Sequence, residues 1–185
     1  AFYTTKRLQA DPPQGALNYV RESELEDDAL VSLYLATNQD IISLAKAELL
    51  NKLLKPAFYD QIRTQEQLTY SPFTATVQVD ESVGFGLFTQ SPAVGSATLY
   101  ERFQVFLDNF KATLADTKES DFEEIKKAHI ANYLAKPSNL GTEFSYLTDE
   151  WMSNKENIDT KLQHVARLKS VSLKQVQQYY TDLFF

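Results

Sequence analysis

The stretch from Pro56 to Gln90 changes its hydrophobic period once, and this change restricts most strongly how the chain can fold. Up to Leu68 apolar residues recur at helical spacing. From Phe73 to Val79 apolar and polar residues alternate, which is typical of a half-buried strand. A turn at residues 80–82 and a second alternating run follow. The sequence therefore predicts a short helix, beginning at Pro56 because proline suits the first helical position, that runs into a β-hairpin.

The return strand of this hairpin contains Gly84 and Gly86, while Val83, Phe85 and Leu87 share its apolar face. Glycine inside a strand often marks a place where another backbone or a ligand approaches closely. A sheet tightly covered by a helix is the simpler explanation of the two glycines, and a nearby ligand is the alternative.

Upstream, the run from Ala29 to Thr37 is almost continuously apolar, which predicts a central strand buried on both faces. A helix capped by Thr37 or Asn38 should follow and continue until Pro56 interrupts it. Residues 17–20 are a candidate first strand.

Downstream of the hairpin, hydrophobic spacing and capping residues predict five more helices. The first has a stripe of large apolar side chains, the second and the last begin with the capping boxes Ser120/Glu123 and Ser172/Gln175, and the third begins at Asn139. Their predicted inward residues are, helix by helix, Leu99, Phe103, Phe106, Phe110 and Leu114; Phe122, Ile125, Ala128, Tyr133 and Leu134; Leu140, Phe144, Leu147 and Trp151; Leu162, Val165, Ala166 and Leu168; and Val176, Tyr179, Tyr180 and Leu183.

This order of elements predicts the α+β class, as a two-layer sandwich in which a mainly antiparallel sheet is covered by helices. Residues 1–15, with Pro12, Pro13 and Gly15, form the expected linker or N-terminal extension. Residues 16–185 are expected to form a single domain, since their number is within the usual range for one hydrophobic core.

Composition excludes several classes of partner and site. The net charge of −7 disfavours nucleic acids and anionic membranes, and no apolar run reaches the length of about eighteen residues that a membrane span needs. The absence of cysteine rules out disulfides, thiolate catalysis and cysteine-bound metals. The N-terminus lacks the apolar region of a signal peptide, so any export signal of a parent protein would lie outside this chain.

The run IRTQEQLTY, preceded by FYDQ and followed by the hairpin, resembles the Leu-Arg-Thr-x-Glu-Gln-Leu-Gly-Tyr segment of pitrilysin-like and insulin-degrading-enzyme-like zinc metallopeptidases. In these enzymes the segment belongs to the last of four related domains. The resemblance extends from about Leu30 through the hairpin and continues more weakly to the C-terminus. It implies a non-catalytic C-terminal domain with a fold like the domains of pitrilysin and mitochondrial processing peptidase, whose sheet faces a substrate chamber. Thr69 in place of the usual glycine and Pro72 early in the strand depart from the pattern.

Arg63 and Tyr70 are the candidate substrate-binding residues. An arginine fork and a tyrosine hydroxyl can together hold a peptide carbonyl. From the residues alone, the simpler interpretation pairs Arg63 with Asp60 or Glu66 and leaves Tyr70 as an ordinary aromatic at the start of a strand. The resemblance implies instead that this pair, seven positions apart as in the family, contacts substrate near the scissile bond.

The chain lacks the His-x-x-Glu-His motif that supplies zinc ligands and the general base in this group of peptidases. Its two histidines, His129 and His164, are expected on helix surfaces or in local hydrogen bonds, and not as metal ligands. We therefore expect no catalytic residue, no metal site and no cofactor in this chain, with zinc held by another domain of the parent.

The resulting prediction is a C-terminal domain that closes the chamber and positions peptide substrate for a zinc metalloendopeptidase, and that is inactive alone. The alternative is a stand-alone scaffold or partner subunit of the same fold; a self-contained hydrolase is a third possibility. Expected partners are peptide substrate and the other domains of the parent or a catalytic subunit, but no nucleic acid and no membrane. The resemblance implies a periplasmic or secreted location, with a cytoplasmic one as the alternative.

Overall fold

The computed structural model describes residues 20–21, 24, 26–36, 40–79, 82–136, 139–152 and 160–185, with the backbone alone for residues 79, 146, 147 and 149–152. The predicted linker at residues 1–15, the predicted strand before Val20 and the predicted caps Thr37 and Asn38 lie outside this part. The elements are β1 (Asp28–Leu35), α1 (Ser43–Tyr59), the π-helix η1 (Asp60–Gln65), β2 (Phe73–Val79), β3 (Ser82–Ser91), α2 (Ser96–Ala115), α3 (Glu119–Leu134), α4 (Leu140–Met152), α5 (Thr160–Ser170) and α6 (Leu173–Phe184).

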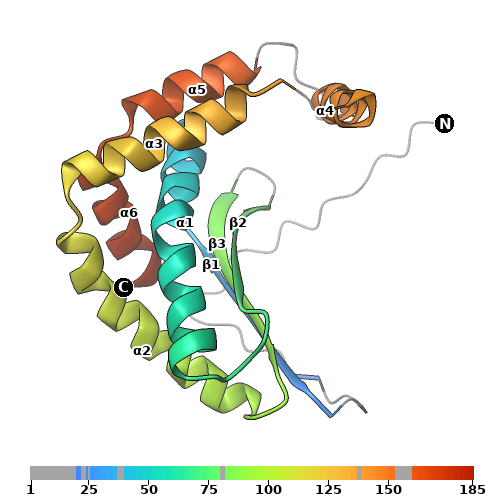
Figure 1. Cartoon of the computed structure of the whole chain (residues 1–185), viewed down its shortest axis with the longest axis vertical. Coiled ribbons are helices and arrows are strands. Elements are labelled where there is room, and N and C mark those ends of the chain that lie inside the picture. The colour runs from blue at the N-terminus through green and yellow to red at the C-terminus, as the bar shows by residue number, and fades with distance from the viewer. Residues whose placement is uncertain are drawn as a thin grey trace.

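The three strands form an antiparallel sheet in the order β1-β3-β2, in which Phe88 of β3 lies opposite Val31 on one side and Phe73 on the other. Helix α1 lies against one face of this sheet. Helices α2, α6, α3 and α5 curve around the side of α1 that faces away from the sheet, whereas α4 stands apart (Figure 1). The α+β class and the two-layer arrangement with a helix-covered antiparallel sheet are confirmed. None of the described helices is long and apolar enough to cross a membrane.

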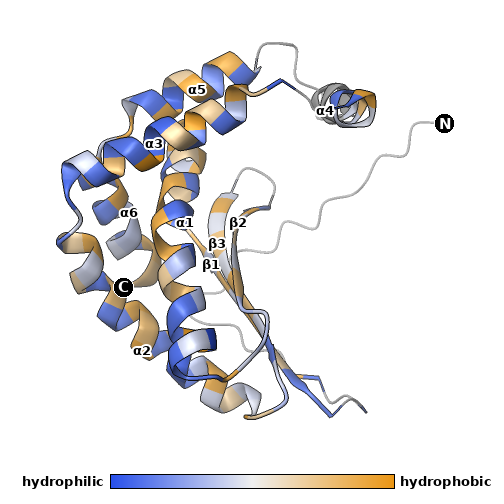
Figure 2. Cartoon of the chain, viewed as in Figure 1, coloured by the Kyte–Doolittle hydropathy of each residue, from blue (hydrophilic) through white to orange (hydrophobic). Residues whose placement is uncertain are grey.

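Helix α1 is the centre of the hydrophobic core. It contacts β2, β3, α2, α3, α5 and α6, and its residues Leu49, Leu50, Leu54 and Phe58 have no exposed surface. The helices carry both hydrophobic and hydrophilic residues (Figure 2), and many of the hydrophobic ones are those that face this core. Each fully buried side chain of this size contributes on the order of 1.5–3 kcal/mol, so α1 holds the two layers together.

The predicted interruption at Pro56 is wrong, because α1 continues through this proline to Tyr59. A proline inside a helix removes one hydrogen bond and costs about 3 kcal/mol. Leu54 and Phe58 on either side are fully buried, and their burial offsets this cost. Tertiary packing therefore overrides the local preference of proline.

The predicted central strand buried on both faces is also wrong. Within the described sheet, β1 is an edge strand and β3 is the centre. Val31, Leu33 and Leu35 are 57%, 53% and 48% exposed, because the described helices cover only the opposite face. A continuous apolar run predicts burial on both faces only if a second layer covers the sheet.

In β3 the predicted alternation is confirmed, since Val83, Phe85 and Leu87 are buried in the core. In β2 it is the polar Thr74 that is buried, and its hydroxyl donates to Asn51 Oδ1 of α1 at 2.5 Å. Phe73 is 51% exposed on the opposite face. The apolar residues of β2 therefore do not all point towards the helices.

A tightly covering helix was the simpler explanation of Gly84 and Gly86, but this explanation is wrong. A Cβ atom on Gly84 would lie 2.2 Å from the carbonyl oxygen of Tyr34, and one on Gly86 would lie 2.3 Å from the ring of Phe88. That ring stacks on Phe73 at a centroid distance of 4.6 Å. The glycines therefore make room for the neighbouring strand and for an aromatic pair on the face opposite the helices.

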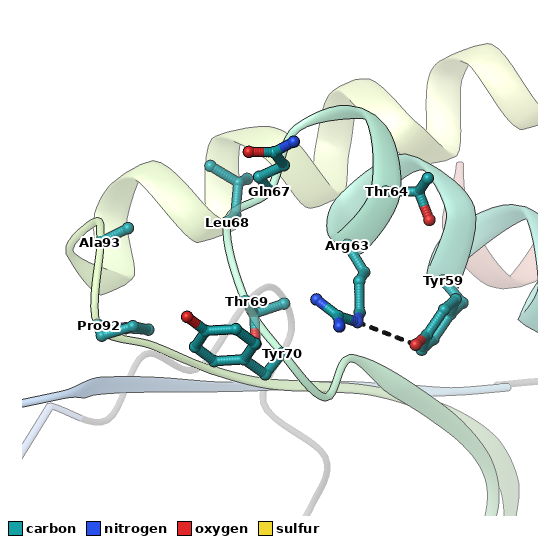
Figure 3. A pocket seen from close by; sticks show the side chains of 9 residues that line it. All are labelled: Tyr59, Arg63, Thr64, Gln67, Leu68, Thr69, Tyr70, Pro92 and Ala93. Carbon is teal, nitrogen blue, oxygen red and sulfur yellow. Dashed lines mark hydrogen bonds between the residues drawn. The ribbon is translucent and has the colours of Figure 1, made fainter.

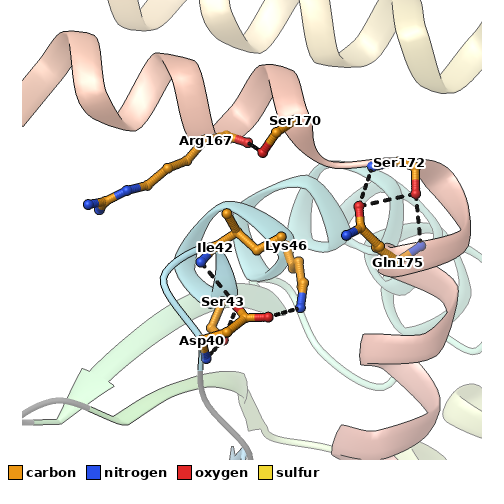
Figure 4. A network of polar contacts seen from close by, with 8 residues as sticks. All are labelled: Asp40, Ile42, Ser43, Lys46, Arg167, Ser170, Ser172 and Gln175. Atoms are coloured by element: carbon orange, nitrogen blue, oxygen red, sulfur yellow. Dashed lines mark hydrogen bonds and ion pairs between the residues drawn. The ribbon is translucent and has the colours of Figure 1, made fainter.

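Some helices begin as the sequence predicts, and Figure 4 shows the start of α6 with Ser172 and Gln175. The capping box of Ser172 and Gln175 at the start of α6 is confirmed, and the Asn139 side chain caps α4 by accepting from the Thr142 amide. Helix α3 instead begins at Glu119, and the hydroxyl of Ser120 bonds Asp121. The predicted box at Ser120 is therefore wrong, because an adjacent carboxylate takes its hydroxyl.

The predicted inward residues are buried in α2 and α6, but only some of them are buried in the helices between. Leu147 and Trp151 lie outside the side chains that the structure describes. The predicted inward residues that are exposed are Ala128, Leu134, Leu140, Phe144, Leu162 and Ala166. Leu140 and Phe144 are exposed because α4 stands apart from the core (Figure 1). In α3 the buried polar residue is Lys126, whose ammonium donates to the carbonyl of Val171 at 3.0 Å.

His129 of α3 and His164 of α5 both meet the carboxylate of Glu48 on α1. Their Nε2 atoms lie 3.0 and 2.8 Å from the same oxygen, Oε2. The histidines are hydrogen-bonded, but their partner lies 81 and 116 positions away in the sequence and not nearby, so these bonds link three helices. Burial by itself would raise the pKa of Glu48, but the hydrogen bonds and charges of the two histidines outweigh it and lower this pKa from 4.5 to about 2.

A glutamate whose folded pKa is lowered stabilises the fold above its unfolded pKa of 4.5, and this contribution is lost as the pH falls towards 2. After allowance for solvent screening, we expect a loss on the order of 1–2 kcal/mol across this range. Glu48→Gln should be less stable than the parent at pH 7 and should show a flatter pH dependence of unfolding between pH 5 and 2.5. Urea unfolding at several pH values measures both effects, with Glu101→Gln on the surface of α2 as the matched control. Parallel curves for Glu48→Gln and the parent would contradict this account.

Candidate functional site

A hollow of about 550 Å³ lies where η1, the loop before β2 and the loop after β3 meet (Figure 3). Both candidate substrate-binding residues, Arg63 and Tyr70, line it. The lining residues are Tyr59, Arg63, Thr64, Gln67, Leu68, Thr69, Tyr70, Pro92 and Ala93. The structure thus brings together in one place two residues that the sequence separates by seven positions.

Arg63 makes two contacts within this hollow. Its Nε donates to the hydroxyl of Tyr59 at 3.0 Å, and its guanidinium carbon lies 5.4 Å from the ring centroid of Tyr70. The simpler interpretation, an ion pair with Asp60 or Glu66, is wrong for the part of the chain described. Asp60 accepts instead from Gln65, and Glu66 pairs with Arg102. Arg63 therefore keeps its charge available to a ligand.

Arg63 lies on a π-helix, where the sequence predicted an ordinary helix. Two side-chain pairs five residues apart follow this wider turn: Gln65 donates to Asp60 at 2.7 Å, and Gln61 donates to Glu66 at 2.8 Å. Short π-helical segments occur frequently at functional sites. The repeated spacing of amide and carboxylate by five was the sequence signal that could have revealed it.

The end of η1 is fixed to α2 by an ion pair. The guanidinium of Arg102 donates from Nε and Nη2 to the two carboxylate oxygens of Glu66, at 2.7 and 2.6 Å. This hydrogen-bonded pair lowers the pKa of Glu66. The next residue, Gln67, adopts a left-handed conformation with φ of 55°. The chain therefore turns at Gln67, directly after a residue that Arg102 of α2 holds in place.

The loop that leads to Tyr70 is hydrogen-bonded to the end of β3. The hydroxyl of Thr69 donates to the carbonyl of Gln90, and Ser91 Oγ donates to the carbonyl of Leu68 at 2.5 Å. Ser91 Oγ also accepts from the amide of Ala93 at 3.1 Å. Thr69 replaces the glycine that is usual in the family, and here its side chain is buried and anchors the loop.

Tyr70 follows this anchored loop directly and is 73% exposed. Its ring lies beside the guanidinium in the hollow, between Arg63 and Pro92 (Figure 3). An exposed phenol and a charged fork can donate hydrogen bonds to a carbonyl oxygen, and both favour an oxygen that gains negative charge. The described residues include no group of three side chains suited to holding a metal ion.

Arg63 and Tyr70 were predicted from the sequence, whereas Tyr59 and the anchors Arg102 and Ser91 were not. Tyr59 could have been found, because residues four apart on a helix are neighbours. Arg102 and Ser91 could not, because their partners lie 36 and 23 residues away in the sequence.

Comparisons with protein families, with curated proteins and with solved structures all find relatives among peptidases of one type. Residues 49–148 match the family described as PQQ synthase PqqF-like, C-terminal lobe domain 4. Protease 3 of Escherichia coli K12 is 30% identical over 176 residues, which are 95% of this chain and 18% of that protein. A Schizosaccharomyces pombe protein provisionally named as a zinc protease is 30% identical over 139 residues, which are 72% of this chain and 14% of that protein. The crystal structure of pitrilysin matches with a TM-score of 0.80 and 29% identity, covering 86% of this chain and 17% of that one.

The chain spans less than a fifth of the length of these relatives. The matched family describes a C-terminal lobe domain. Residues 49–148 of this chain, which match it, include most of α1, all of η1, the hairpin and every residue that lines the hollow. This chain therefore belongs to the PqqF-like family of C-terminal lobe domains of pitrilysin-type peptidases.

Proposed function

We propose that this chain is the non-catalytic C-terminal domain of a zinc metalloendopeptidase, where it closes the substrate chamber and positions peptide substrate. The main support is the shared hollow in which the guanidinium of Arg63 lies 5.4 Å from the ring of Tyr70. The names of relatives as proteases agree with it.

Zinc belongs to another domain of the parent in this proposal. The chain contains two histidines and lacks the His-x-x-Glu-His pattern, so its residues do not fit the metal centre of this peptidase group. Both histidines already hydrogen-bond Glu48. A periplasmic or secreted location is part of the same proposal and rests on the resemblance to the family.

The hollow acts by holding the peptide carbonyl. The terminal nitrogens of Arg63 and the hydroxyl of Tyr70 donate hydrogen bonds to the carbonyl oxygen, and these bonds become stronger as negative charge develops on it. Because Tyr59 occupies Nε of Arg63, the two terminal nitrogens are the donors that remain. The domain thereby contributes to stabilising the transition state without supplying a nucleophile or a base.

Tyr70→Phe in the full-length parent enzyme should lower kcat by about 10-fold to 1,000-fold, because it removes one hydrogen bond and keeps the ring. Arg63→Ala should lower kcat/KM, and Arg63→Lys should restore only part of it, since lysine lacks the planar fork. Steady-state hydrolysis of a fluorogenic peptide measures these values, and melting temperatures should stay within a few degrees. Unchanged kinetics for Tyr70→Phe, or a loss of stability that accounts for the lost activity, would contradict the proposed role.

Arg102→Gln should lower activity although Arg102 lies outside the hollow. The substitution breaks the ion pair with Glu66, so the reversal at Gln67 loses its outer support and Tyr70 is held less firmly. We expect a fall in kcat/KM that is smaller than that of Arg63→Ala, with a small change in melting temperature. Lys118→Gln, on the link between α2 and α3, is the control. Parent-like kinetics for Arg102→Gln would show that the ion pair does not position the loop.

The isolated chain should bind no zinc tightly and cleave no peptide, and it should associate with the remaining domains of the parent when they are supplied separately. Metal analysis after dialysis, a peptide assay and analytical ultracentrifugation measure these three properties. The exposed apolar face with Val31, Leu33 and Phe73 gives a physical reason for association. Stoichiometric zinc with turnover would overturn the proposed division of labour, and failure to associate at tens of micromolar would argue against an interdomain role.

A further inference from the structure

We infer that Tyr59 is a positioning residue that sets the direction of the Arg63 guanidinium, an inference that rests on the proposed function of the hollow. Its hydroxyl oxygen accepts the hydrogen bond from Arg63 Nε at 3.0 Å. Tyr59 is thus the third residue of a unit whose other members, Arg63 and Tyr70, contact the substrate.

Arginine needs such support, because its long side chain carries about 2 kcal/mol of rotamer entropy when it is free. Two contacts restrict Arg63: the ring of Tyr70 lies beside its guanidinium, and the hydroxyl of Tyr59 binds Nε (Figure 3). A cation near a ring can slide over it, whereas a hydrogen bond at Nε fixes the rotation of the planar group. The bond to Tyr59 therefore determines which edge of the fork faces the ligand.

Tyr59 can do this because its backbone lies between residues that are buried in the core. It is the last residue of α1 and the one before η1. Its neighbours Phe58 and Ile62 have no exposed surface, so the turn between Tyr59 and Arg63 is anchored in the core. Tyr59 as a residue is 45% exposed, and it lines the hollow.

The competing explanation treats Tyr59 as a surface aromatic that meets Arg63 without consequence. The two explanations differ in whether the effect of removing the Tyr59 hydroxyl depends on Arg63. If Tyr59 acts through Arg63, removal of its hydroxyl has an effect only while arginine is present. If Tyr59 acts on stability or directly on substrate, the effect persists without Arg63.

A double-mutant cycle in the full-length parent enzyme tests this difference. Tyr59→Phe, Arg63→Ala and the double variant are compared with the parent by kcat and KM on one fluorogenic peptide. Tyr100→Phe is the control, because Tyr100 is also 45% exposed and lies outside the hollow. We expect Tyr59→Phe to lower kcat/KM by roughly 3-fold to 10-fold in the parent, as one hydrogen bond is lost. The same change should have no effect in the Arg63→Ala background, and Tyr100→Phe should be silent.

The outcomes separate this inference from the function on which it rests. If Arg63→Ala leaves kcat/KM unchanged, the proposed function fails and the inference fails with it. If Arg63→Ala impairs the enzyme but Tyr59→Phe has equal effects in both backgrounds, or none in the parent, the function stands and the positioning role is overturned. A fall in melting temperature that accounts for the loss in Tyr59→Phe would overturn it as well.

Discussion

The burial of α1 between the sheet and the other helices is the constraint on which the rest of this domain depends. Its residues Leu49, Leu50, Leu54 and Phe58 are buried in the core, and the helix contacts elements of both layers. This packing carries the helix through Pro56 and delivers its last residue, Tyr59, directly to η1. The core thus determines where Arg63 lies, although the side chain of Arg63 itself is only partly buried.

The hollow shows a division of labour among neighbouring residues. Glu66 and Thr69 are used for structure, the first in the ion pair with Arg102 and the second in a bond to the end of β3. Arg63 and Tyr70, on either side, keep partly exposed side chains with donors that remain available. Anchoring through adjacent residues holds these exposed groups in place without burying them.

Polar contacts also hold the helices of the helical layer together. Glu48 joins His129 and His164, so that one carboxylate links α1, α3 and α5. The two histidines, which the sequence did not favour as metal ligands, stabilise the layer that supports the hollow. By contrast, the open face of the sheet retains exposed apolar residues such as Val31 and Phe73, as expected for a domain that meets other parts of a larger protein.

The sequence by itself determined the features that depend on local spacing. These are the hairpin, the inward stripe of α2 and the capping box at Ser172. A nine-residue run and its family resemblance also marked Arg63 and Tyr70 as the candidate substrate-binding residues. The tertiary structure decided what depends on distant partners. Pro56 stays within a helix because the core pays for the lost bond, and Ala29 to Leu35 exposes one face because the described helices cover only the other. Arg63 remains available because Glu66 finds Arg102, 36 residues further on. Periodicity reports which side chains are apolar, but only the assembled layers decide which surfaces are covered and which charges meet.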